Sequence, residues 1–384
     1  MEGLLEATSG AESEIDSDVQ RLYTVTGRLG EGAFGIVFDA ISRKRPRDRV
    51  ALKRCIGCLD ASDTLTLQRV YREVAVLRQL HHDSIITIRD LVLPANSSDL
   101  YLVFDVMSLD LERAIRHSVV QSAEQYQNVT VQLLRALAYL HAAHLLHRDL
   151  KPSNVLMDSQ GHVKLCDFGL VRFVGLYPRG LTAYVGMRWY RAPELFLGST
   201  RYGTGVDIWA LGCVVGEMLL GRPLLMGASS DEQLGLAVGL VLGRRASQEE
   251  VDISGMPEAA AQLAAVQPVG QTLETRLQGD NPDNAPAVDF VRRCIGLSPD
   301  DRPSARELLQ HSFVEQLRED SDDLVWSEPV ELPLTDGCSH DPDEYVAALL
   351  VEVHAIRQAW ALRHPASRES TDSNCSLETD TSVD

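Results

Sequence analysis

The sequence predicts an α+β protein in which a small, β-rich N-terminal part is followed by a larger helical part. From Tyr23 to Val103, short β-type runs dominate, among them "YTVTGRL", "IVFDAIS" and "RVALKRC", and a single stretch of helical spacing, from about Leu65 to Leu80, interrupts them. Beyond about Asp110 the apolar residues recur at helical spacing, as in "EQYQNVTVQLLRALAYLHAAHLL". We expect a cleft where the two parts meet, at "DVMSLD".

Composition narrows the classes of partner and compartment. The chain has 384 residues, of which 45% are hydrophobic, enough for a sizeable core. Its formal net charge of −19 disfavours nucleic acid as a partner and favours basic peptides. No run of about 18 uncharged apolar residues occurs, so no membrane insertion is predicted. Scattered cysteines and an acidic N-terminus without a signal-peptide pattern predict an intracellular protein, in the cytoplasm, with the nucleus as an open second location.

The first chemical motif is "GRLGEGAFGIVFDA", in which Gly30, Gly32 and Gly35 form the pattern GxGxxG. A dinucleotide-binding domain needs a helix directly after these glycines, whereas the strand-like "IVFDAIS" follows them here. We therefore expect the glycines in a hairpin turn that covers phosphates, and a plain glycine-rich turn is the alternative. The pair Cys55 and Cys58 lacks a second pair at zinc spacing, so no metal finger is predicted.

The next motifs supply charged residues in a set order. "VALK" places Lys53 on a strand, and Glu73 lies in the helix that follows, so the two side chains can pair. "LLHRDLKPSNVL" then contributes Asp149, Lys151 and Asn154, and "KLCDFGL" contributes Asp167. Transfer of a γ-phosphoryl group needs metal ions, an acceptor for the hydroxyl proton and cations that anchor the nucleotide. These residue types match those tasks.

Together with "APE", these motifs occur in the order and spacing of the eukaryotic protein kinases, which the chain resembles. The resemblance implies a bilobal fold and the cofactors ATP and Mg²⁺. It implies that Lys53 anchors the phosphates and is held by Glu73, that Asp149 accepts the substrate proton, and that Lys151 steadies the transferred phosphate. Asn154 and Asp167 would hold the metal ions. The implied ATP-binding residues are Leu29, Gly30, Glu31, Gly32, Ala33, Phe34, Gly35, Ile36, Val37, Ala51, Lys53, Asp105, Met107, Asp110 and Leu156, with Phe104 as gatekeeper.

Within the kinases, "LTAYVGMRWYRAPE" resembles the activation segment of the mitogen-activated protein kinases. Thr182 and Tyr184 are then the switch residues, phosphorylated by an upstream dual-specificity kinase. Phosphate adds about −1.5 to −2 charge, which arginine pairs well because its guanidinium is forked. The resemblance assigns Arg69, Arg148 and Arg172 to phosphorylated Thr182, and Arg188 and Arg191 to phosphorylated Tyr184. It also implies serine or threonine substrates followed by proline.

The resemblance also divides the chain. The kinase domain is expected over residues 22–313, with an N-lobe over about 22–106, a C-lobe over about 110–313 and an insert at about 240–280. An extension over 314–362 would carry Glu319 and Asp322, which match carboxylates that dock basic-hydrophobic peptides of phosphatases or scaffolds. Its last helix has an apolar stripe expected to face the body: Val346, Leu349, Leu350, Val353 and Trp360. Residues 1–21 and 363–384 are expected to be disordered.

Two positions depart from the kinase pattern. Ala183 stands between the switch residues, where the family usually has Glu, Gly or Pro, so the subclass stays open. Met187 occupies a position where most serine/threonine kinases have a threonine that bridges Asp149 and Lys151. Two hypotheses follow: an active kinase, or a nucleotide-binding scaffold that has lost efficient transfer. The resemblance further implies that Glu194 and Arg302 form a structural ion pair of the helical lobe and that Asp207 anchors a helix there, so these three residues are expected to be architectural.

Overall fold

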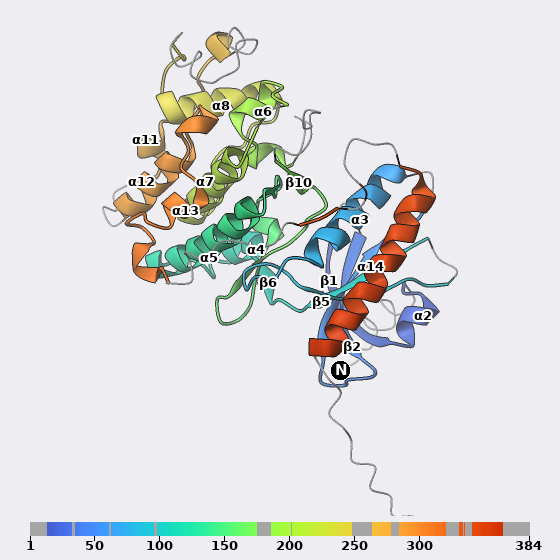
Figure 1. Cartoon of the computed structure of the whole chain (residues 1–384). Coiled ribbons are helices and arrows are strands. Elements are labelled where there is room, and N and C mark those ends of the chain that lie inside the picture. Colours follow the sequence, from blue (N-terminus) through green and yellow to red (C-terminus); the bar gives the residue numbers. More distant parts are fainter. Residues whose placement is uncertain are drawn as a thin grey trace, which may run out of the picture.

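The computed structural model describes residues 14–363 except 33–34, 61–62, 96–97, 175–185, 201, 248–262, 278–283, 320–329, 333 and 335–339, and it describes no side chain from 360 onward. A five-stranded sheet with two helices along it forms one lobe, and a larger helical lobe lies beside it (Figure 1). Within the described part of the chain, no helix combines the length and apolarity needed to span a bilayer. The predicted division into a small β-rich part and a larger helical part is confirmed.

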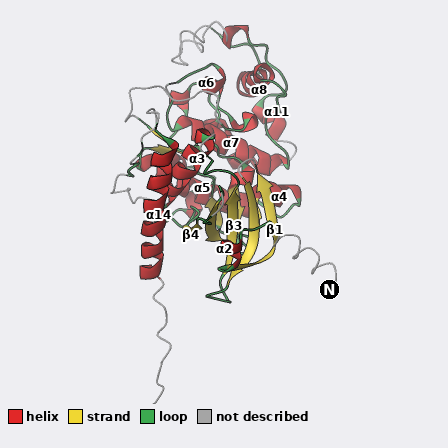
Figure 2. Ribbon diagram, turned by 90° about the vertical axis from the view of Figure 1, so that its right-hand side faces the viewer, coloured by secondary structure: helices red, strands yellow, loops and turns green. Residues whose placement is uncertain are grey.

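The sheet of the first lobe is antiparallel and has the strand order β1-β2-β3-β5-β4 (Figure 2). Its strands are β1 (Tyr23–Gly32), β2 (Gly35–Ser42), β3 (Arg49–Cys55), β4 (Ile88–Val92) and β5 (Leu100–Asp105). Strand β3 has the bounds of the predicted run, because β-branched and apolar residues fill a central strand that is covered on both faces. The glycine-rich segment is the β1–β2 hairpin, as predicted, with Gly32 opposite Gly35.

The outer face of this sheet has its own apolar cluster, which includes Val25, Phe38 and Leu52. The short helix α2 (Ser17–Gln20) closes it, since Ile15 and Val19 are buried there. Residues 14–21 therefore do not follow the prediction of a disordered N-terminus. Composition favoured disorder in this acidic stretch, but two apolar side chains are enough to fix it against a preformed face.

Two helices cover the other side and the edge of the sheet lobe. Helix α3 (Thr64–Leu77) begins at Asp63, whose side chain accepts a hydrogen bond from the Thr66 amide at 3.1 Å. Helix α14 (Pro342–Arg363) packs along α3 and β4, although it is the last helix of the chain (Figures 1 and 2). The two helices meet at Tyr71 and Tyr345, whose ring centroids are 5.5 Å apart.

The buried face of α14 differs in part from the predicted stripe. Leu349 and Val353 are buried and Val346 is half-buried, as expected, but Leu350 is 47% exposed. The prediction for Leu350 was wrong because the buried stripe follows Tyr345, Leu349, Glu352, Val353 and Ile356. Glu352 belongs to it because its carboxylate pairs with Arg78 of the sheet lobe. The Trp360 side chain lies outside the described residues.

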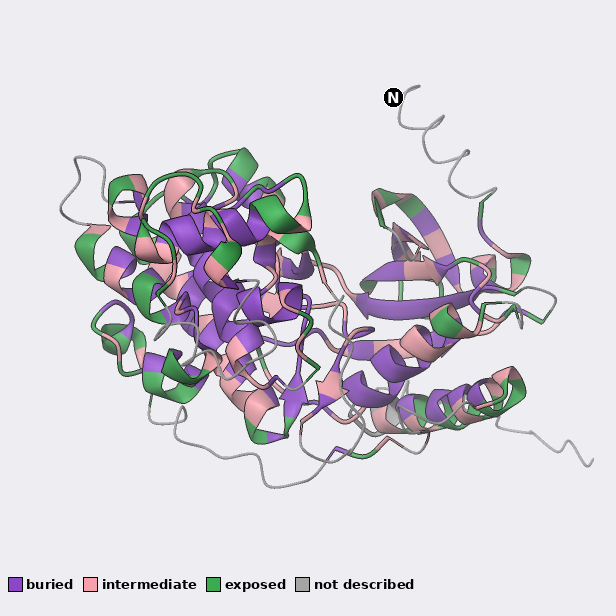
Figure 3. Cartoon of the chain, turned by 90° about the horizontal axis from the view of Figure 1, so that it is seen from above, coloured by how far each residue is buried: buried purple, intermediate pink, exposed green. Residues whose placement is uncertain are grey.

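The helical lobe is built around α5 (Ala123–Ala142), α7 (Gly205–Leu220) and α12 (Ala285–Cys294). Helix α5 begins with a capping box, in which Ser122 and Gln125 bond each other's backbone amides. Figure 3 shows the buried interior of this lobe. Its smaller elements are β6 (Leu109–Asp110), α4 (Leu111–Arg116), β7 (Leu145–Leu146), η1 (Pro152–Asn154), β8 (Val155–Met157), β9 (Val163–Leu165), β10 (Arg172–Phe173), η2 (Arg188–Tyr190), α6 (Pro193–Phe196), α8 (Ser230–Leu242), α11 (Leu273–Leu277), η4 (Pro299–Asp301), α13 (Ala305–Leu308) and η5 (Glu315–Leu317).

Helix α7 carries a buried carboxylate, Glu217, which accepts a hydrogen bond from the Tyr190 hydroxyl at 2.6 Å. Burial, with a smaller contribution from the charge of Glu112, raises the pKa of Glu217 to about 7. An unfolded glutamate titrates near pH 4.3, at about the ordinary value. Between these two values the folded state holds the proton more tightly than the unfolded state, so stability falls as the pH rises through this window.

Replacing Glu217 by glutamine removes this titration. We expect the difference in unfolding free energy between the variant and the wild type to shift in favour of the variant by about 2 kcal/mol as the pH rises from 5 to 8. Urea unfolding of both proteins at the two pH values measures the change. A difference in stability that is the same at pH 5 and pH 8 would show that Glu217 titrates normally.

Candidate active site

A cavity of about 590 Å³ lies between the sheet lobe and the helical lobe, a volume typical of small-molecule sites. It occupies the junction at which a cleft was expected. Its walls come from β1, β2, β3 and the end of β5 on one side, and from β6, α4, η1 and β8 on the other. The predicted site residues that line it are Leu29, Gly30, Glu31, Gly32, Gly35, Val37, Ala51, Lys53, Glu73, Phe104, Asp105, Met107, Asp110, Lys151, Asn154, Leu156 and Asp167.

The glycine-rich hairpin forms one edge of the cavity. Gly35 has φ +139°, and a Cβ atom there would lie 1.8 Å from the carbonyl oxygen of Arg54 on β3. Only glycine fits this close approach. Ile36 does not line the cavity, because strand alternation turns its side chain into the apolar cluster on the outer face of the sheet. Ala33 and Phe34 lie outside the described residues.

Lys53 and Glu73 join β3 to α3. The Lys53 Nζ lies 2.8 Å and 2.7 Å from the two carboxylate oxygens of Glu73. Burial alone would lower the pKa of Lys53, but the carboxylates of Glu73 and Asp167 outweigh burial and raise it. The ammonium group is therefore charged at neutral pH and available to an anion in the cavity.

Asp149, Lys151 and Asn154 form a hydrogen-bonded group in the segment that leads into η1. The Lys151 Nζ lies 2.7 Å from Asp149 Oδ2, and the Asn154 Nδ2 donates to the same oxygen at 3.0 Å and to the Asp149 carbonyl at 2.8 Å. The backbone amide of Met187 donates to Asp149 Oδ1 at 3.0 Å. The Met187 side chain is 40% exposed. Donors on both oxygens hold the Asp149 carboxylate in one orientation.

The backbone next to Asp149 is held by a residue of helix α7. Arg148 and Asp167 have φ values of +67° and +65°, which non-glycine residues seldom adopt. The buried carboxylate of Asp207 on α7 accepts hydrogen bonds from the backbone amides of His147 and Arg148, at 2.9 Å and 2.8 Å. These two bonds support the backbone at Arg148. Strained backbone of this kind collects at functional sites, where the surrounding structure holds it. The architectural role predicted for Asp207 matches this geometry.

Asn154 and Asp167 carry side-chain oxygens of the kind that bind magnesium. Among the described residues, no group donates a hydrogen bond to Asn154 Oδ1 or to the Asp167 carboxylate, although both residues line the cavity. Carboxylate and amide oxygens are the ligands that Mg²⁺ uses beside phosphate oxygens and water. The residues present therefore fit a divalent ion brought in with a nucleotide.

Comparison with known proteins agrees with this geometry. Residues 23–314 match the protein kinase domain family. The chain is 36% identical over 344 residues to extracellular signal-regulated kinase 2 of Dictyostelium discoideum, and the match covers 87% of this chain and 90% of that protein. It is 33% identical over 324 residues to mitogen-activated protein kinase 7 of Arabidopsis thaliana, covering 83% and 86% of the two chains. The chain belongs to the mitogen-activated protein kinase family.

A further relative of this kinase differs in length. The mouse protein named mitogen-activated protein kinase 15 is 38% identical over 343 residues, which make up 87% of this chain. The match spans only 61% of the mouse protein, so the chain covers about three-fifths of that relative.

The arginines assigned to phosphorylated Thr182 gather around the segment that follows Asp167. Arg148 donates from Nε to the Leu170 carbonyl at 2.8 Å and from Nη1 to the Tyr202 hydroxyl at 2.7 Å. Arg69 lines a small cavity with Gly169 and Leu170, and Arg172 lies on β10 just beyond them. Thr182 and Tyr184 themselves lie outside the described residues.

The two arginines assigned to phosphorylated Tyr184 contact loops on either side of η2. Arg188 donates to the Ala228 carbonyl at 2.6 Å, and Arg191 donates to the Gly186 carbonyl at 2.8 Å. Gly186 has φ +73°, and a Cβ atom there would lie 2.6 Å from the Arg148 carbonyl oxygen. The first arginine group thus lies beside residues that precede the switch segment in the chain, and the second group belongs to residues that follow it.

Sequence reasoning missed Arg72. It precedes Glu73 on α3, is only 2% exposed, and donates to the Gly169 carbonyl at 2.7 Å. This bond ties α3 to the segment after Asp167. No sequence signal marked this position, because Arg72 lies off the apolar stripe of Val70 and Val74, and only the fold supplies the acceptor that a buried arginine needs. Further cavity-lining residues that were not predicted are Ile86, Ser108, Leu109, Glu112, Arg113, Arg116, Ser153 and Cys166.

Of the predicted docking carboxylates, Glu319 is described and Asp322 is not. The Glu319 side chain is 66% exposed and lies 3.1 Å from Arg135 of α5. Most of the Glu319 side chain is thus at the surface, although the arginine it contacts is largely buried.

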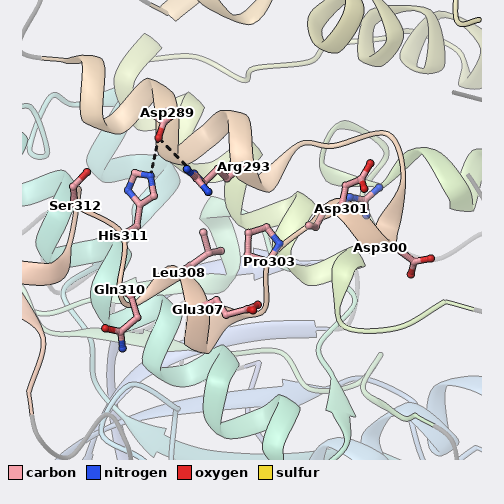
Figure 4. Close-up of a pocket in the computed structure, with 11 residues that line it drawn as sticks. Asp289, Arg293, Asp300, Asp301, Pro303, Glu307, Leu308, Gln310, His311 and Ser312 are labelled. Carbon is pink, nitrogen blue, oxygen red and sulfur yellow. Dashed lines mark hydrogen bonds and ion pairs between the residues drawn. The ribbon is translucent and has the colours of Figure 1, made fainter. Parts of the chain in front are cut away.

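A second cavity, of about 610 Å³, lies in the helical lobe between α12 and α13 (Figure 4). His311 lies 3.0 Å from Asp289 through its Nε2 atom, and Arg293 contacts the same carboxylate at 3.5 Å. Three of the polar side chains that line this cavity, those of Asp289, Arg293 and His311, thus contact one another. Asp300 and Asp301 add further carboxylates at its rim. None of the predicted site residues lines it.

Proposed function

We propose that this kinase transfers the γ-phosphoryl group of ATP to serine or threonine hydroxyls that precede proline in protein substrates. The observation that carries the proposal is that the Lys53–Glu73 pair lines one cavity together with Lys151 and Asn154, the two residues that bond the Asp149 carboxylate. Asp149 itself is not among the residues that line the cavity. The names of the relatives support the class of reaction.

The chain's own residues divide the reaction among them. The substrate hydroxyl oxygen attacks the γ-phosphorus, the bond from that phosphorus to the β-phosphate oxygen breaks, and ADP leaves. The Asp149 carboxylate orients the hydroxyl and accepts its proton. Lys151 offsets negative charge on the transferred group, and Lys53 anchors the remaining phosphates. Mg²⁺, held by Asn154 and Asp167 when bound, supplies neutralising charge.

Phosphorylation of Thr182 and Tyr184 is the switch in this proposal. Two phosphates would draw the arginines around Leu170 and around η2 into charge-assisted hydrogen bonds. What supports this is the position of Arg69, Arg148 and Arg172 beside the segment after Asp167, and of Arg188 and Arg191 at the far end.

A peptide assay tests the reaction and its specificity. Full-length chain carrying both phosphates should transfer phosphate from Mg-ATP to a basic Ser-Pro peptide and label it at least about tenfold faster than the Ser-Ala peptide. Equal rates would remove the proline requirement. Labelling no faster than that of an Asp149→Asn control would favour a nucleotide-binding scaffold, the alternative suggested by Met187.

Met187 provides a prediction about rate. Its backbone amide bonds Asp149, but its thioether cannot bridge Asp149 and Lys151 as a hydroxyl could. We expect Met187→Thr to raise kcat by about two- to fivefold, the equivalent of one added hydrogen bond of about 0.5–1 kcal/mol. Met187→Val is the matched control, since it has the shape of threonine without the hydroxyl. Equal rates for the two variants would contradict the bridging argument.

The proposed partners are proteins that carry basic-hydrophobic docking peptides. Glu319, exposed near η5, would receive basic-hydrophobic peptides of scaffolds, phosphatases or the upstream kinase. Location in the cytoplasm, and in the nucleus as well, stays a prediction.

A further inference from the structure

The hinge that joins the two lobes is the segment "DVMSLD", residues 105–110. Charged residues from three strand regions meet at its first residue, Asp105. Arg89 on β4 pairs through Nη1 with Asp48, at 2.6 Å, and through Nη2 with the carboxylate of Asp105. All three side chains are partly buried, with 20% exposure for Arg89 and 29% and 32% for its partners. Asp48 lies in the β2–β3 turn, and Asp105 is the last residue of β5.

The backbone places Arg89 for this contact. Ile88 pairs with Phe104 and Asp90 pairs with Val103, so Arg89 is an extra residue in β4 at a β-bulge. A bulge bends its strand and re-aims the side chain at that position. Here the side chain reaches the residue after the gatekeeper.

Asp105 connects this ion pair to the nucleotide cavity. It lines the cavity beside Phe104 and precedes Met107, which lines it too. Its backbone pairs with Val50 of β3, so a shift of Asp105 would also move the strand that carries Lys53. The hinge is therefore held both by the sheet and by a side-chain brace.

The C-terminal helix is attached to the same bulge. Arg357 of α14 donates to Asp90 Oδ1 at 2.9 Å and to the Leu91 carbonyl at 2.6 Å. Five charged residues thus lie in one group behind the hinge: Asp48, Arg89, Asp90, Asp105 and Arg357. Three of them are carboxylates, so each arginine offsets repulsion among its neighbours.

We propose that Arg89 is a positioning residue for nucleotide binding, which fixes the hinge through Asp105. The inference rests on the proposed function, since the cavity must take ATP. Without the guanidinium, Asp48 and Asp105 lose the cation they share, and the backbone that would meet adenine loses its brace.

The test is the dissociation constant of the non-hydrolysable analogue AMP-PNP with Mg²⁺, measured by calorimetry on the full chain. Arg89→Met should raise this constant about fivefold, the equivalent of about 1 kcal/mol for a partly buried pair. Arg89→Lys should restore part of the loss because it keeps one charge. The double variant that combines Asp105→Asn with Arg89→Met should raise the dissociation constant no more than Arg89→Met alone, because the two residues act as a unit.

Arg49→Met is the matched control. Arg49 pairs with Asp39 at 2.7 Å across β2 and β3 in the same sheet, its side chain is 61% exposed, and neither residue lines the cavity. Its dissociation constant should equal that of the wild type. If the wild type binds the analogue but Arg89→Met binds it equally well, or Arg49→Met loses as much affinity as Arg89→Met, the positioning role of Arg89 is wrong and nucleotide binding in the cavity still holds. A wild-type chain that binds no analogue would overturn the proposed function and the brace with it.

Discussion

Replacing Asp149 by asparagine should lower kcat for peptide phosphorylation about 10³-fold, within the range found for general acid–base groups. The amide keeps the shape of the side chain but cannot accept the substrate proton. Binding of Mg-AMP-PNP should change by less than about twofold, because Lys53 and the apolar walls of the cavity stay in place. Steady-state kinetics and calorimetry on the same preparation measure the two quantities.

Asp300→Asn is the control for this experiment. Asp300 is an exposed aspartate of the helical lobe at the rim of the second cavity (Figure 4). Its loss should leave kcat unchanged. A residual rate in Asp149→Asn within about tenfold of the wild type would mean that Asp149 is no proton acceptor.

The largest effect on stability is expected at Arg302. Its guanidinium binds Glu194 through two hydrogen bonds of 2.7 Å each, and both side chains are at most 1% exposed. Arg302→Met should cost about 3–5 kcal/mol of unfolding free energy, because it leaves the Glu194 carboxylate buried without its partner. Urea or thermal unfolding measures this loss.

A surface pair supplies the comparison for Arg302. Arg21 and Asp18 lie 3.1 Å apart with the arginine 77% exposed. Arg21→Met should cost less than about 0.5 kcal/mol. If Arg302→Met costs no more than Arg21→Met, the pair does not hold the helical lobe together.

The sheet lobe and the main site elements were predictable because local pattern and packing agree there. Strand β3 is buried over much of its length, and its bounds, Arg49–Cys55, match the predicted run. The glycine hairpin was recognised by the strand that follows it. The Glu194–Arg302 pair was expected from the resemblance and is present.

Other features depended on tertiary contacts that no local pattern encodes. The order of residues 14–21 comes from Ile15 and Val19 filling the outer face of the sheet. The exposure of Leu350 follows from how α14 turns to bury Glu352 against Arg78. Arg72 has no sequence mark that separates it from a surface arginine, since its acceptor is a carbonyl 97 residues away.

The central claim is that the chain transfers phosphate at the cavity lined by Lys53, Lys151 and Asn154 once both switch residues are phosphorylated. Single-turnover transfer to a Ser-Pro peptide, measured on chromatographically separated forms with no phosphate, with either phosphate and with both, tests it most directly. The claim predicts a rate in the doubly phosphorylated form at least about 10²-fold above every other form, as several charge-assisted bonds form together. Equal rates in all forms would contradict it.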